Sequence, residues 1–85
     1  MIPEQIQEMT AYIRTAILRN SNAEIGIDTA LISSGMVDSL ALVDILMHLQ
    51  CVTGRRIPAG KVQLRDLDTI NKMFATAERV GRPQR

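Results

Sequence analysis

The apolar positions along the chain predict helices. From residue 3 to about residue 19, apolar side chains recur at steps of three and four residues, which places them on one face of a helix: Ile6, Met9, Ile13, Ala16 and Ile17. Pro3 suits the first turn of this helix, where its missing N–H loses no hydrogen bond. Nowhere do apolar and polar residues alternate with a period of two, so we expect no strand.

A second and more apolar helix is predicted to start at Asp38 or Ser39 and to run to about Thr53. Asp38 is a favourable N-cap residue, and Gly54 is a natural C-terminal stop. Part of this helix forms an inward stripe: Leu42, Ile45, Leu46 and Leu49. Three further apolar residues fall to one side of that stripe: Leu40, Val43 and Met47. An exposed apolar flank on a small domain is typical of a binding surface.

The remaining segments complete the predicted fold. Residues 20–37 form a long first loop, which we expect to be ordered and packed by its own side chains, Ile25, Ile27, Leu31 and Ile32. Beyond a turn at Ile57-Pro58, residues 61–64 form at most a short helix. Asp68 and Thr69 then cap a final helix to about Val80, with Ile70, Met73, Phe74 and Ala77 facing inward. We expect an all-α bundle of three main helices plus one short helix, in one domain over residues 1–85 with a frayed tail at 81–85.

Composition excludes several classes of function. The chain has 85 residues, so most of its apolar side chains are needed for the core. Aromatic residues make up 2%, which argues against the stacking platforms of single-strand nucleic-acid binders. One cysteine and one histidine offer no metal-ligand spacing. Cys51 cannot form an internal disulfide, and its apolar helical surroundings favour a buried structural thiol. Without a visible signal peptide or membrane-length apolar run, we expect a cytoplasmic protein.

Charge is divided unevenly along the chain. The first 50 residues contain six acids and two bases, whereas the last 35 contain eight bases and three acids. This asymmetry suggests a surface of two signs that orients protein partners, although a solvated basic face is the simpler reading.

The candidate chemistry lies at Ser39, where the second helix is predicted to begin. An Asp-Ser pair at a helix start is common simply because both side chains cap free backbone N–H groups. As a nucleophile, Ser39 would need an adjacent base. The single histidine, His48, lies nine residues further along the same helix, about 13 Å away by helical rise, and we interpret it as a surface residue. We therefore expect no catalytic activity and read Ser39 as a site that another enzyme modifies.

The run Gly-Met-Val-Asp-Ser-Leu at residues 35–40, with the apolar positions after it, resembles the phosphopantetheine attachment region of the acyl and peptidyl carrier protein family. Ile57-Pro58 resembles the family's turn between its second and third helices, and residues 67–70 resemble the lead into its last helix. The resemblance implies that Ser39 receives a 4′-phosphopantetheine group from coenzyme A and that Asp38 is recognised by the transferase. It also implies a partner-facing set, Leu40, Asp44 and Met47, to which we add Met36, Arg55 and Arg56.

Two features favour a particular type of carrier. Gly35 stands four residues before Ser39, which resembles carriers for D-alanine and for other acids activated by stand-alone ligases. Gln50 stands where fatty-acid carriers have an acid, and the C-terminal half is basic. We therefore expect a monomeric carrier of a specialised pathway. Its expected partners are a phosphopantetheinyl transferase, an adenylating ligase or other acyl-loading enzyme, and an acyl-accepting enzyme, with no role for metal, membrane or nucleic acid.

Two alternatives stay open. The chain could be an unmodified carrier-like helical module for protein interaction, in which case Ser39→Ala is silent while changes at Leu40 or Met47 disrupt partner binding. It could also be a basic helical nucleic-acid binder, with salt-sensitive affinity for DNA or RNA centred on Arg55, Arg56 and Lys61. The low aromatic content and the net charge of +1 favour this last reading least.

Overall fold

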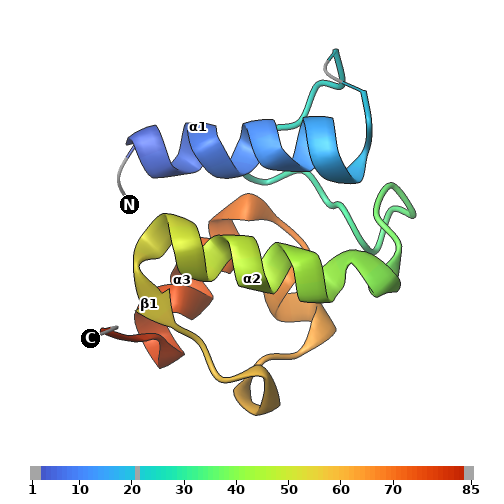
Figure 1. Ribbon diagram of the computed structural model, residues 1–85. Coiled ribbons are helices and arrows are strands. Elements are labelled where there is room, and N and C mark those ends of the chain that lie inside the picture. The colour runs from blue at the N-terminus through green and yellow to red at the C-terminus, as the bar shows by residue number, and fades with distance from the viewer. Residues whose placement is uncertain (1–2, 21, 84–85) are drawn as a thin grey trace.

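The computed structural model describes residues 3–20 and 22–83. In Figure 1, α1 (Pro3–Tyr12) and α2 (Leu42–Thr53) lie side by side and run in opposite directions, and α3 (Ile70–Val80) packs against both. A π-helical turn, η1 (Ile13–Ile17), continues α1, and a 3₁₀ turn, η2 (Ser39–Ala41), leads into α2. The short helix expected at residues 61–64 is absent from the described chain. Two 3₁₀ turns lie around this stretch instead, η3 (Ala59–Lys61) and η4 (Leu64–Leu67). The protein is a small all-α fold, as predicted.

The core is formed where the apolar stripes of the three helices meet. Most of the predicted inward positions are confirmed, including these fully or nearly fully buried side chains: Met9, Ile13, Ile45, Leu49, Ile70, Met73, Phe74 and Ala77. Ala16 was expected in the first stripe, but it is exposed. The reason is the wider turn of η1, in which the Leu18 N–H donates to the Ile13 carbonyl at 2.8 Å. Such a turn shifts the later residues around the helix axis, so that Ile17 and Leu18 contact the core.

The prediction that the chain has no strands is wrong at one place. β1 (Arg55–Arg56) pairs antiparallel with β2 (Arg82–Pro83), and Arg56 stands directly opposite Arg82. Two residues are too few to show an alternating pattern in the sequence, which is why periodicity misses this ladder. The pairing also corrects the expected frayed tail at residues 82–83, whereas residues 84–85 lie outside the described part of the chain.

Three side chains lie in surroundings that the sequence did not predict. Cys51 is exposed, so the expected buried thiol is wrong; α2 has more apolar residues than its buried face holds, and the neighbouring Val52 is buried instead. Ile27 does not pack the long loop, because 41% of its surface is exposed. His48 is not a simple surface residue. Its ring stacks on Tyr12 with 3.8 Å between the ring centroids, and its buried Nε2 has no hydrogen-bond partner among the described residues.

Candidate functional site

Ser39 lies at the first position of η2, directly after an extended residue. Asp38 has φ −74° and ψ 146°, and its Oδ1 accepts a hydrogen bond from the Leu40 N–H at 3.0 Å. Asp38 is therefore the N-cap that the sequence predicted. The Ser39 hydroxyl donates to the same Oδ1 at 3.5 Å, which is the outer limit of a hydrogen bond. The side chain of Ser39 is exposed and is only weakly held.

Asp68 fastens the long loop that leads to Ser39. Its Oδ1 accepts hydrogen bonds from the N–H groups of Ile32 and Ser33 at 2.7 and 2.9 Å, and its Oδ2 accepts from the Ser33 hydroxyl at 2.8 Å. The Asp68 carbonyl accepts from the Leu31 N–H at 2.8 Å. The sequence predicted Asp68 as a cap of the last helix, but that role belongs to Thr69, whose hydroxyl oxygen accepts from the Lys72 N–H. Asp68 instead joins segments 35 residues apart.

These contacts hold the pKa of Asp68 below its ordinary value. The hydrogen bond from the Ser33 N–H contributes most, followed by the Ser33 hydroxyl, while the Ile32 N–H and the charge of Lys72 act in the same direction. Burial of the carboxyl opposes them, because a low-dielectric environment disfavours the charged form. Asp68 is therefore an ionised, buried clamp at neutral pH.

The last turn of the loop connects the part held by Asp68 to Ser39. The Val37 N–H donates to the Leu31 carbonyl at 2.8 Å, and the Val37 side chain is buried in the core. Gly35 closes this turn with φ 85°, a left-handed conformation that glycine adopts without strain. Because Val37 is anchored two residues before Ser39, the serine is held at a defined place on the surface. No sequence pattern predicts this clamp, because Asp68 and the loop that it binds are 35 residues apart in the chain.

The predicted partner-facing residues lie together on one exposed face. Leu40, Asp44 and Met47 follow one another at steps of four and three residues, and the exposed fractions of Leu40 and Met47 are 84% and 59%. Val43 joins this face with 65% of its surface exposed. Met36, on the preceding loop, is 42% exposed. The exposed flank predicted for the second helix is confirmed.

Arg55 and Arg56 lie at the opposite end of α2 from Ser39. Arg56 is exposed, whereas Arg55 is half-buried and its guanidinium donates to the Gly81 carbonyl at 3.5 Å. Gln50 lies five residues before Arg55, and from the sequence we considered only its lack of charge. Its side-chain oxygen accepts from the Ile57 N–H at 2.8 Å and so ties the turn after β1 back to α2.

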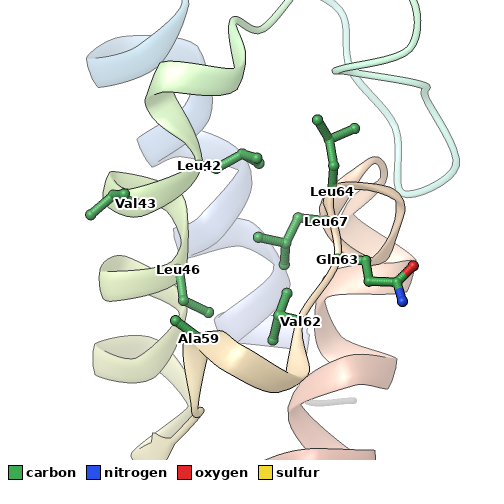
Figure 2. A pocket seen from close by; sticks show the side chains of 8 residues that line it. All are labelled: Leu42, Val43, Leu46, Ala59, Val62, Gln63, Leu64 and Leu67. Carbon is green, nitrogen blue, oxygen red and sulfur yellow. The ribbon is translucent and has the colours of Figure 1, made fainter.

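A small apolar pocket lies beside the exposed face, between α2 and the segment that contains η3 and η4 (Figure 2). Its volume is about 160 Å³. Leu42 and Leu46 extend from α2 toward Val62 and Leu67 on the opposite wall, and Val43 also belongs to the lining. α2 therefore lines a pocket with these three side chains, while Met47 faces solvent.

Within residues 3–20 and 22–83, Asp38 is the sole hydrogen-bond partner of the Ser39 hydroxyl, and His48 is engaged with Tyr12. The same residues contain no group of three or more side chains able to hold a metal ion.

Comparison with protein-family models and with curated proteins gives no match for this chain. Among the helices that the structure describes, none has both the length and the apolar character needed to cross a membrane.

Proposed function

We propose that the protein is a carrier that holds an acyl or aminoacyl group on a 4′-phosphopantetheine group attached to Ser39. The observation that supports this most directly is the exposed Ser39 hydroxyl, presented at an Asp-capped helix start beside an exposed apolar face. A serine without a neighbouring base suits modification by another enzyme better than catalysis.

The residues at the site fit the attached group. The Ser39 Oγ forms the phosphoester bond to the pantetheine phosphate, adenosine 3′,5′-bisphosphate leaves, and the serine proton passes to a base of the transferase. Asp38 holds the backbone of the acceptor turn through the Leu40 N–H. When bound, the group supplies a terminal thiol that holds the acyl group as a thioester. The anchored loop keeps the attachment point in place, and the tether raises the effective concentration of the acyl group at each partner enzyme.

The charges of the chain support a specialised pathway. Partners that dock through arginine-rich patches need an acidic carrier, and here the end of α2 is followed by Arg55 and Arg56. We accordingly propose a monomer in the cytoplasm that is loaded by its own adenylating ligase or other acyl-loading enzyme and unloaded by its own acceptor enzyme.

Intact-mass spectrometry tests the proposal. The unmodified chain is incubated with coenzyme A, Mg²⁺ and phosphopantetheinyl transferases of broad specificity. We expect a gain of one phosphopantetheine mass for the wild type and none for Ser39→Ala. The matched control is Ser34→Ala, which removes an exposed hydroxyl of the preceding loop and should leave the mass gain intact. Circular dichroism should report the same helix content for all three proteins, because the Ser39 hydroxyl makes only a 3.5 Å bond and the Ser34 hydroxyl bonds to loop carbonyls outside the helices.

The exposed face of α2 favours a second candidate, an unmodified interaction module, because Leu40 and Met47 can contact a partner with or without an attached group. That candidate requires that several transferases leave the wild-type mass unchanged. A gain of mass that persists in Ser39→Ala would refute the assignment of Ser39.

A further inference from the structure

Three arginines from two distant segments form a cluster at the C-terminal end of α2. β1 contributes Arg55 and Arg56, and β2 contributes Arg82, which pairs with Arg56 across the ladder. Arg55 is partly compensated by the Gly81 carbonyl at the end of α3. Within the described residues, Arg56 and Arg82 are both exposed and make no ion pair. Like charges directly opposite each other in an antiparallel pair are destabilising, so the ladder concentrates positive charge here at some cost to stability.

The other end of α2 has the opposite sign. Asp38 and Asp44 are exposed there. The exposed apolar side chains of Leu40, Val43 and Met47 occupy the helix surface from that end toward the arginine cluster. Acids at the start of a helix and bases at its end also complement the helix dipole. Arg82 lies two residues beyond the end of α3, where a base also complements the dipole of that helix, and the ladder brings it opposite Arg56.

We infer that this face docks a protein of opposite polarity, with basic residues opposite Asp38 and Asp44, an apolar centre, and carboxylates opposite Arg56 and Arg82. The identification of the partner as a carrier-dependent enzyme rests on the proposed function. The match of charges and apolar surface between the two faces does not depend on it. The apolar centre fits a protein better than a nucleic acid, because a phosphate backbone would leave the apolar side chains uncovered and would meet two carboxylates.

The polarity fixes the direction in which the partner lies. A partner turned end for end would set bases against Arg56 and Arg82 and acids against Asp38, which like-charge repulsion disfavours. The basic end of the partner is therefore the end nearest Ser39. This differs from a uniformly acidic recognition helix, which would accept a uniformly basic partner in either direction.

Synthetic peptides provide a test that needs no identified partner. Three amphipathic helical peptides share one leucine stripe: a bipolar peptide with lysines at one end and glutamates at the other, an all-lysine peptide and an all-glutamate peptide. Binding to the unmodified ¹⁵N-labelled chain is followed by NMR at low salt. We expect the bipolar peptide to bind about fivefold more tightly than either uniform peptide, as two or three exposed charge pairs allow. A spin label at its glutamate end should broaden the amides of Arg56 and Arg82, and one at its lysine end those of Asp44 and its neighbours.

Charge reversal supplies the matched control. Arg56→Glu with Arg82→Glu should transfer the preference to the all-lysine peptide, while Lys61→Glu with Arg65→Glu, an equal change at exposed positions of η3 and η4, should keep the bipolar preference. Equal binding of the bipolar and all-lysine peptides by the wild type would overturn the inference, as would tighter binding of a short DNA duplex at the cluster. These measurements use the unmodified chain, so they are independent of the mass test. The bipolar preference can be absent while Ser39 gains the phosphopantetheine mass, and it can be present while Ser39 gains none.

Discussion

The substitution Asp68→Ala tests whether a single buried carboxylate positions the loop before Ser39. The wild-type carboxylate accepts from two backbone N–H groups and one hydroxyl. Hydrogen bonds to a charged group contribute about 1.5 kcal/mol or more each, so the two backbone bonds alone give about 3 kcal/mol. The Ser33 side chain is exposed and can bind water instead, so we count nothing for it. A loss of about 3 kcal/mol is large for a small domain, whose free energy of unfolding is on the order of 5–10 kcal/mol.

Chemical and thermal unfolding followed by circular dichroism measures this loss. We expect the variant to unfold roughly 12–24 °C below the wild type at pH 7. The folded-state pKa of Asp68 lies below its unfolded value, so its contribution is fully present above the unfolded pKa, about 4. The contribution disappears as the pH falls through the folded pKa. The stability difference between wild type and variant should therefore shrink below about pH 4.

Asp28→Ala is the matched control, because Asp28 also joins the loop to α3, through an exposed bond to the Asn71 amide at 3.2 Å. It should change the free energy of unfolding by less than about 0.5 kcal/mol. A loss below about 1 kcal/mol for Asp68→Ala would refute the clamp. A large loss that stays constant from pH 7 to pH 3 would show that packing, and not charge, is responsible.

Three further outcomes follow from the structure. Gly54→Ala should lower the free energy of unfolding by about 1 kcal/mol in urea titrations, because Gly54 ends α2 at φ 67°, while Gly60→Ala, at an open position without positive φ, should not. Met73→Ala should lower the free energy of unfolding by about 2–5 kcal/mol and Met47→Ala by less than about 0.5 kcal/mol, because Met73 is fully buried and Met47 is exposed. Equal losses would contradict the assigned core. Tyr12, the single tyrosine, should ionise above pH 10 in an ultraviolet titration of the folded chain, because burial and the charge of Asp44 raise its pKa; the same midpoint in urea would contradict this.

Local features of the sequence determined the helices and their ends. The three- and four-residue spacing of apolar side chains identified the buried faces of α2 and α3, since burial on a helix follows its own period. Asp38, Gly54 and Thr69 were predicted as caps because a cap binds backbone groups within a few residues of itself. Ser39 could be located for the same reason, as the residue that follows an N-cap.

Tertiary structure decided everything that joins distant segments. Asp68 was read as a local cap, yet its carboxylate binds backbone groups 35 and 36 residues away. The His48 side chain is partly buried because α1 places Tyr12 against its ring. Arg82 reached Arg56 through a ladder too short to leave a period in the sequence. Local spacing records which side of a helix is apolar, but which segment covers that side depends on how the helices pack. For that reason the sequence located the serine, and the fold decided how it is held and which charges surround its docking face.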